Sequence, residues 1–254
     1  MSSPTLLEPV GAVGDLGPTD RREGFGWLAV AVAGFFVGEF VALLLAEAGV
    51  AITGTPGGIT ALSRMSVPPV WFVCCELVGL WVGFGGAALV VTRTGRKVGL
   101  RFLPYDVVFI ALGLALQLAI TAAYAPFHLK GFSKPVNHVL GGGSGWLLVI
   151  PACLTVFGAP LFEELYFRGV LLRSFLTLFR TRRAVLGTAL AILVDGVLFG
   201  LAHLGSDSWV QLPGLAATGL VLALLAVLTG RLGPSIVTHA SFNALAVLAF
   251  AVQR

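Results

Sequence analysis

Seven apolar stretches follow one another along the chain, separated by shorter polar segments rich in glycine, proline and basic residues. Each stretch is about 20 residues long, which is the length at which an α-helix crosses the hydrocarbon core of a bilayer. The pattern therefore predicts an all-α fold, a polytopic transmembrane bundle of about seven helices. The predicted spans are residues 27–50, 69–92, 107–126, 146–172, 184–204, 209–229 and 234–252.

Composition supports the membrane assignment. Of the 254 residues, 57% are hydrophobic and only 11% are charged, whereas a soluble domain averages about 25% charged residues. The length suits a single bundle of about six to eight helices joined by short loops. We expect residues 1–26, which are polar and punctuated by glycine and proline, to form a disordered cytosolic tail, and residues 27–254 to form one transmembrane domain.

The basic residues lie mainly between the predicted spans. In a soluble protein the net charge of +4 would suggest nucleic acid as a partner, but a clustering of Lys and Arg in loops instead sets the orientation in a membrane. Eleven of these residues fall on the side of the N-terminus and four on the opposite side. The positive-inside rule then predicts a cytosolic N-terminus. The lipid bilayer is an expected partner, and nucleic acid is not.

The fourth stretch carries three ionisable residues at membrane depth. Glu163, Glu164 and Arg168 lie within six residues, and each would cost about 3 kcal/mol on insertion scales. Glu164 and Arg168 are four residues apart and share one helix face, where they can pair. Glu163 lies about 140° around the helix from Arg168. We therefore predict that Glu164 is neutralised while Glu163 stays free for chemistry.

Two later stretches carry a second polar set. Phe199 and His203 are four residues apart, with Asp195 four residues earlier, and His239 and Asn243 show the same spacing in the last stretch. Polar side chains on different helices are satisfied inside a bilayer only by converging on one another. The sequence therefore predicts one intramembrane cavity. Because His239 closely follows a predicted cytosolic turn, we expect this cavity to face the cytosolic half of the membrane.

These residue types suit the hydrolysis of an amide or an ester. A carboxylate and a histidine that reach the same water can remove its proton. A second histidine and a carboxamide can donate hydrogen bonds to the oxyanion of a tetrahedral intermediate. Two histidines and a glutamate are also a zinc set, although the H-E-x-x-H pattern of the common zinc proteases is absent. Zinc held by Glu163, His203 and His239 is therefore an open alternative, and no other cofactor is expected.

Three motifs occur in order in the late predicted spans. Together they resemble those of the CPBP family of intramembrane proteases, which comprises the type II CAAX prenyl endopeptidases and their bacterial Abi relatives. The resemblance covers about residues 146–250, which we expect to be the catalytic core, whereas the first three spans are similar only in being hydrophobic. The motifs are Glu163-Glu164-x-x-x-Arg168, Phe199-x-x-x-His203 and His239-x-x-x-Asn243.

The resemblance implies a hydrolase, an intramembrane endopeptidase acting on a membrane-anchored protein or peptide. In that family pattern Glu163 would be the general base, and His203 would help to hold and activate the water. His239 and Asn243 would stabilise the oxyanion. The substrate would be a CAAX-type prenylated protein in one branch of the family, or another membrane-anchored protein in the bacterial branch, and the expected location is a bacterial cytoplasmic membrane.

The remaining motif residues would support the site. By the same resemblance, Glu164 and Arg168 would form a pair that holds the helix in place, and Phe199 would pack beside the catalytic groups. The family is labelled as metalloproteases, and a metal-free glutamate mechanism is also argued for it. The sequence leaves both the metallo- and the glutamate-dependent mechanism open.

Two other classes of function use the same residues differently. A non-catalytic membrane scaffold or bacteriocin-immunity factor would keep the polar cluster only for helix packing. A proton-coupled transporter would use the glutamates as a relay, but the sequence shows no inverted repeat of short, broken spans. The scaffold or immunity factor is therefore the main alternative to the protease.

Overall fold

The computed structural model describes residues 17–128, 138–142, 145–180, 184–204 and 209–253. Within these ranges every regular element is a helix and no β-strand occurs, so the predicted all-α class is confirmed. Seven helices or helix runs are long and apolar enough to cross a membrane. They are Arg21–Thr53, Val70–Thr92, Pro104–Phe127, Gly145–Leu178, Ala184–Leu201, Leu212–Thr229 and Gly233–Val252.

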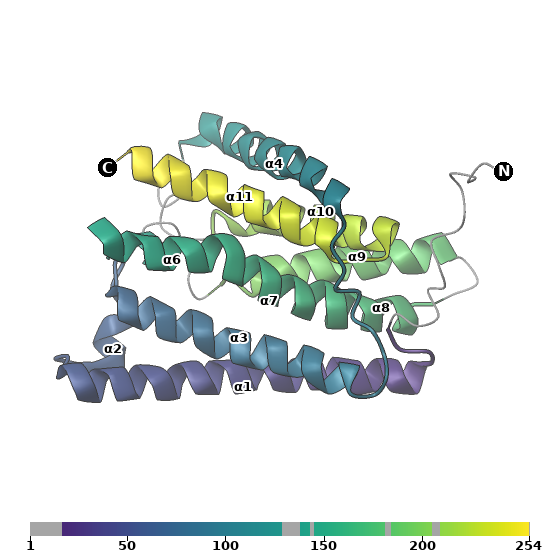
Figure 1. The fold of residues 1–254 in the computed structure, drawn as a ribbon, viewed down its shortest axis with the longest axis horizontal. Coiled ribbons are helices and arrows are strands. Elements are labelled where there is room, and N and C mark those ends of the chain that lie inside the picture. The colour runs from purple at the N-terminus through teal and green to yellow at the C-terminus, as the bar shows by residue number, and fades with distance from the viewer. Residues whose placement is uncertain (1–16, 129–137, 143–144, 181–183, 205–208, 254) are drawn as a thin grey trace.

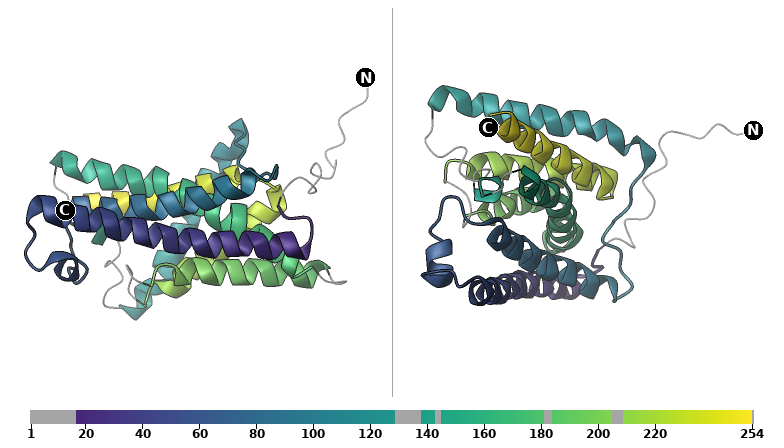
Figure 2. Two further views of the ribbon diagram at one scale, coloured as in Figure 1. Left: turned by 90° about the horizontal axis from the view of Figure 1, so that it is seen from below. Right: turned by 60° about the vertical axis from the view of Figure 1, so that its left-hand side comes forward.

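The fourth span lies in the middle of the bundle. It consists of consecutive segments that run as one helix, and it packs against α1, α3, α9, α10 and α11 through one segment or another. Figure 1 shows it between the α1–α3 pair on one side and α11 with α4 on the other, and Figure 2 shows the same arrangement from two further directions. The segments of this span are η4 (Gly145–Leu148), α6 (Val149–Cys153), η5 (Leu154–Gly158), α7 (Ala159–Tyr166), η6 (Phe167–Leu171) and α8 (Leu172–Leu178).

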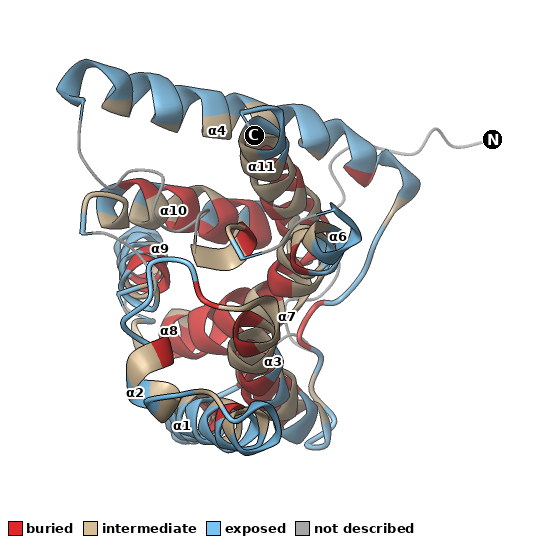
Figure 3. Cartoon of the chain, turned by 90° about the vertical axis from the view of Figure 1, so that its left-hand side faces the viewer, coloured by how far each residue is buried: buried red, intermediate tan, exposed pale blue. Residues whose placement is uncertain are grey.

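The other elements surround this central span. They are α1 (Arg21–Thr53), α2 (Gly58–Leu62), α3 (Val70–Thr92), η2 (Pro104–Val108), α4 (Phe109–Tyr124), η3 (Ala125–Phe127), α9 (Ala184–Leu201), α10 (Leu212–Thr229) and α11 (Gly233–Val252). Figure 3 shows that buried residues gather on the sides of α7, α8 and α10 that face the middle, whereas α4 is exposed along most of its length. Large apolar side chains on the outer surface, such as Phe36 and Ile52, are exposed as lipid-facing residues should be.

Glycines allow neighbouring helices to approach closely. In the α1–α3 pair, a Cβ added at Gly83 would collide with the carbonyl oxygen of Gly34 and with the backbone of Gly38. In the α9–α10 pair, a Cβ at Gly219 would lie 2.8 Å from the carbonyl oxygen of Gly196. Close backbone contact through small residues is a usual way for helices to associate inside a bilayer, where apolar side chains gain little from leaving lipid.

Several predicted limits differ from the structure. α1 begins at Arg21 because Asp20 caps it by accepting a hydrogen bond from the backbone N–H of Glu23. The last six residues of the predicted tail, 21–26, are therefore helical, and residues 1–16 lie outside the described residues. The fourth span continues to Leu178 rather than ending at residue 172, since Arg173 is a buried residue that contacts the Gly230 carbonyl oxygen and not a loop residue. The cytosolic location of the N-terminus stays a prediction.

The close approach of α1 and α3 predicts different outcomes for two equivalent substitutions. Gly83→Ala would force the two helices apart and should lower the stability by about 1–3 kcal/mol. Gly86→Ala is the matched control on the same helix, because no atom lies within 4 Å of an added Cβ there. Thermal unfolding in detergent should show a lower midpoint for Gly83→Ala only. Equal midpoints for the two variants would contradict the packing described for this pair.

Candidate active site

The backbone of the fourth span is distorted on both sides of the two glutamates. The segments η5 and η6 are π-helical, and the short regular α-helix α7 lies between them. In η5 the N–H of Ala159 donates to the carbonyl of Leu154, five residues earlier. Pro160, next in that register, has no N–H to donate, so the carbonyl of Thr155 is left for another donor. Wide helical turns of this kind are common at functional sites.

Asn243 on α11 takes up the carbonyl that Pro160 leaves free. Its Nδ2 donates to the Thr155 oxygen over 2.9 Å. The carboxamide has two N–H bonds, so this contact fixes its orientation and leaves a second N–H for another acceptor. The π-helical turn thus links the last span to the fourth one at the level of the predicted site.

The ring of His239 lies between the two adjacent glutamates of α7. Its Nδ1 is 3.1 Å from Glu164 Oε1, and its Nε2 is 3.8 Å from Glu163 Oε2. An ionised carboxylate can only accept a hydrogen bond, so Nδ1 donates to Glu164 and Nε2 is directed towards Glu163. The two glutamates differ in burial, because the side chain of Glu164 is fully buried and that of Glu163 is 16% exposed. Among the described residues, Glu163 Oε2 has no hydrogen-bond partner.

Arg168 on η6 is the cation of this cluster and is fully buried. Its Nη1 donates to Glu164 Oε1 over 2.9 Å, as the four-residue spacing predicts, and its Nη2 donates to the Gly219 carbonyl over 2.8 Å. Its Nε lies 3.4 Å from Oδ2 of Asp195 on α9. The guanidinium also lies over the ring of Phe199, with its central carbon 4.5 Å from the ring centroid. One arginine therefore joins α7, α9 and α10.

Phe199 separates the two histidines. Its ring centroid is 5.1 Å from that of His203 and 5.5 Å from that of His239. His203 lies in the turn after Leu201, the last residue of α9, and its ring still contacts Phe199, as the four-residue spacing predicts. Its Nδ1 is 2.8 Å from the Phe199 carbonyl oxygen. A carbonyl only accepts, so Nδ1 is the donor in this contact.

The structure brings the predicted residues together to different degrees. Direct contacts join Glu163, Glu164, Arg168 and His239. His203 is connected to them through Phe199, and Asn243 through the backbone of the fourth span. The catalytic roles assigned to these residues from the sequence stay predictions.

Asp195 is a member of the cluster that the predicted site does not include. It is fully buried and paired with Arg168. The signal in the sequence is the one that singles out the glutamates, an ionisable residue within an apolar helix. The backbone partners at Thr155 and Gly219 carry no such signal, because every residue type has a carbonyl oxygen.

The described residues do not form a metal site. No group of three or more His, Cys, Asp or Glu side chains among them is arranged to hold a metal ion. The zinc set of Glu163, His203 and His239 is not assembled, since His203 bonds its own helix end and the ring of Phe199 lies between it and His239. Zinc at this site stays a prediction that no observed geometry supports.

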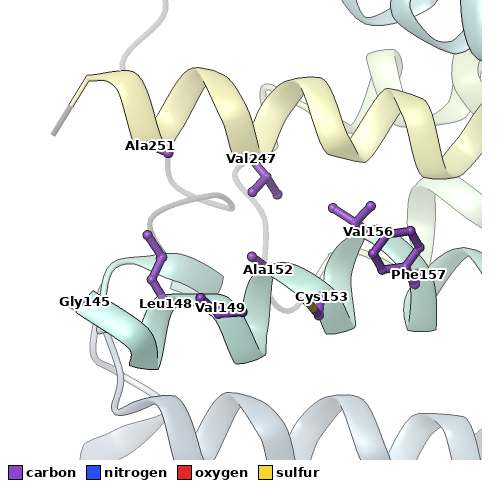
Figure 4. A pocket seen from close by; sticks show the side chains of 9 residues that line it. All are labelled: Gly145, Leu148, Val149, Ala152, Cys153, Val156, Phe157, Val247 and Ala251. Carbon is purple, nitrogen blue, oxygen red and sulfur yellow. The ribbon is translucent and has the colours of Figure 1, made fainter.

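An apolar groove begins beside the Asn243–Thr155 contact. It has a volume of about 280 Å³ and lies between the fourth span and α11, from Val156 and Val247 outwards. Val247 is one helical turn beyond Asn243. Figure 4 shows that its lining side chains are hydrocarbon apart from the sulfur of Cys153. The residues that line it are Gly145, Leu148, Val149, Ala152, Cys153, Val156, Phe157, Val247 and Ala251.

The described residues contain seven helices or helix runs that are long and apolar enough to cross a membrane, and they enclose a buried cluster of carboxylates, arginine and histidine. These features point to an integral membrane protein. Residues 145–245 match the family model described as type II CAAX prenyl endopeptidase Rce1-like. No curated protein and no solved structure matches the chain significantly. The resemblance noted in the motifs is therefore confirmed over this part of the chain, and it implies a membrane endopeptidase of the CAAX protease type.

The buried cluster predicts a large difference between two arginine substitutions. Arg168→Leu would leave Glu164 and Asp195 buried without a cation, which should cost about 3–5 kcal/mol of stability. Arg96→Leu is the matched control, because the Arg96–Glu23 pair is about a quarter exposed and such pairs contribute about 1 kcal/mol or less. Unfolding in detergent measures both effects. A loss for Arg168→Leu no larger than that for Arg96→Leu would contradict the assigned role of the cluster in stability.

Proposed function

We propose that this protein is an intramembrane endopeptidase in which Glu163 activates water to hydrolyse a peptide bond of a membrane-associated protein. The observation that carries the proposal is the difference between the two adjacent glutamates. Glu164 is bound by Arg168 and His239, whereas Glu163 Oε2 faces His239 and has no hydrogen-bond partner among the described residues. A carboxylate oxygen that no hydrogen bond occupies, next to a histidine held in place by Glu164, suits a general base.

The reaction begins with the transfer of a proton from water to Glu163. His203 accepts the second hydrogen of that water through Nε2, since its Nδ1 donates to the Phe199 carbonyl. For this contact the Phe199 ring, which lies between the two histidines in the structure, has to move aside when the substrate binds. The water oxygen bonds to the scissile carbonyl carbon, and the carbonyl oxygen becomes an oxyanion. Glu163 then passes its proton to the leaving amine nitrogen as the carbon–nitrogen bond breaks.

His239 and Asn243 stabilise the oxyanion in this proposal. Asn243 uses the N–H that is not bonded to Thr155. His239 faces the oxyanion with Nε2, and the contact of its Nδ1 with Glu164 Oε1 fixes the orientation of the ring. Donors held in place before the reaction stabilise developing charge without reorganisation.

The substrate in this proposal carries an apolar anchor close to the cleaved bond. The groove supports this, because its lining is apolar and Val247 in its wall lies one helical turn from Asn243 on α11. A CAAX-type protein, with its prenylated cysteine, has an anchor of this kind. The distribution of basic residues supports a site that faces the cytosolic half of the membrane.

Replacing Glu163 tests the proposed function. Glu163→Gln keeps the shape of the side chain and removes its basicity, so cleavage should fall at least about 100-fold while the protein stays folded. Glu39→Gln on α1 is the matched control, the same change at a membrane-span glutamate outside the site. The measurement is terminal-peptide proteomics on membranes that contain wild type or either variant at equal level. New termini should appear with wild type and Glu39→Gln and be absent with Glu163→Gln.

The same experiment distinguishes the scaffold or immunity factor. Full burial of Arg168 between three helices is what a packing device requires. Under that alternative, Glu163→Gln keeps the cellular phenotype and Arg168→Ala loses it. Identical termini in wild type and folded Glu163→Gln would reject the proposed protease in favour of this alternative.

A metal-free mechanism predicts resistance to chelators. His239 contacts Glu164 at Nδ1 and faces Glu163 at Nε2 over 3.8 Å, and the described residues offer no set of three metal ligands. The cleavage rate of protein purified in detergent should therefore change less than about twofold after treatment with 1,10-phenanthroline. A change of that size counts as no effect in this comparison. Loss of activity that added Zn²⁺ restores would establish a metal-dependent mechanism instead.

A further inference from the structure

Asp195 is a fully buried carboxylate that the proposed reaction does not use. It lies on α9 with its Oδ2 3.4 Å from Arg168 Nε. Neither of its oxygens accepts a hydrogen bond within the described part of the chain, and Arg168 Nε likewise has no hydrogen-bond acceptor. The contact is thus an ion pair and not a hydrogen-bonded clamp. A buried carboxylate of this kind is costly, so its presence beside the cluster calls for a reason.

One guanidinium serves two carboxylates here. Arg168 donates to Glu164 on one side and faces Asp195 on the other. Glu164 Oε1 in turn accepts from His239 Nδ1, while Glu164 Oε2 has no partner among the described residues. Because Arg168 is attracted to Asp195 as well, it neutralises Glu164 less completely. The Glu164 carboxylate therefore remains a stronger hydrogen-bond acceptor for the N–H of His239.

The charged and titratable groups around the contacts that run from Asp195 through Arg168 and Glu164 to His239 come from four elements. α7 contributes Glu163 and Glu164, η6 contributes Arg168, and α11 contributes His239. α9 contributes Asp195, with His203 in the turn beyond its end. α10 contributes only the backbone carbonyl of Gly219. Asp195 is therefore the one anion in this set that touches Arg168 without touching His239.

We propose that Asp195 is a positioning residue, which acts through Arg168 and Glu164 to hold His239 in place against Glu163. The proposal rests on the proposed proteolytic function. Without the charge of Asp195, the guanidinium of Arg168 is no longer attracted towards α9 and can move closer to Glu164. That stronger pairing would draw Glu164 away from His239 and loosen the ring that faces the general base.

Asp195→Asn tests the charge without changing the shape. We expect kcat to fall about tenfold with KM changed less than about twofold, the pattern for an interaction that matters in the transition state and not in binding. Removing a negative charge weakens proton binding by the groups around it. Both limbs of the pH–rate profile should therefore move to lower pH, by about 0.5–1 unit for a buried charge at this range.

Asp106→Asn is the matched control. Asp106 is also a buried aspartate, and it is paired with Arg231 at 2.6 Å, but it lies on η2 outside the site. The substitution should lower stability and leave the pH profile where it is in wild type. Asp195→Glu restores the charge and should restore the position of the profile. The probe is an internally quenched peptide with a farnesylated cysteine, cleaved by the full chain in lipid nanodiscs.

A second readout does not depend on cleavage. With ¹⁵N-labelled histidine, the ring signals of His239, assigned by their loss in His239→Gln, should titrate at lower pH in Asp195→Asn than in wild type or Asp106→Asn. Unchanged signals together with an unchanged rate profile in Asp195→Asn would overturn the positioning role. Failure of the proposed function gives a different result: Glu163→Gln cleaves like wild type, or wild type leaves the peptide intact. In either case the His239 signals still show whether Asp195 acts on His239.

Discussion

The need to neutralise one buried guanidinium governs the arrangement of the late spans. Arg168 is fully buried inside an apolar bundle, where an unpaired charge costs far more than any packing contact contributes. Its three nitrogens face three partners: Nη1 faces Glu164, Nη2 the Gly219 carbonyl and Nε Asp195. These partners belong to three different helices, so α7, α9 and α10 can satisfy the charge only in one mutual arrangement. The helix packing and the polar cluster therefore specify each other.

The glycines of α9 and α10 make this arrangement sterically accessible. Arg168 reaches a backbone carbonyl at Gly219 because this residue has no side chain and lies directly against Gly196. A larger residue at either position would separate the two helices. The Gly219 carbonyl is part of an α-helix, so its extra acceptor capacity comes from the second lone pair of the oxygen. Close packing through small residues thus supplies a polar partner at membrane depth without adding another charge.

The number of apolar spans and the pairing of Glu164 with Arg168 could both be predicted from the sequence. Both follow from strong signals, the length of apolar stretches and the four-residue period of a helix. The limits of the first and fourth spans were wrong because local contacts decide them, the cap at Asp20 and the contact of Arg173 with Gly230. The contacts of Asn243 with Thr155 and of Arg168 with Gly219 involve carbonyl oxygens. Backbone partners of this kind leave no mark in the residue pattern and require the fold.

Two adjacent glutamates acquire different properties from the geometry of one helix. A turn of about 100° per residue directs Glu164 towards Arg168 and leaves Glu163 at the side of the cluster. The π-helical turns before and after α7 interrupt the regular ladder at both ends, and Pro160 removes one donor from it. The carbonyl of Thr155 that Pro160 leaves free is the one that Asn243 binds. Glu164, Arg168 and Asp195 compensate one another's buried charge, whereas Glu163 Oε2 accepts no hydrogen bond from the described residues and only faces His239. This division of tasks explains why the pair of glutamates occurs as a pair.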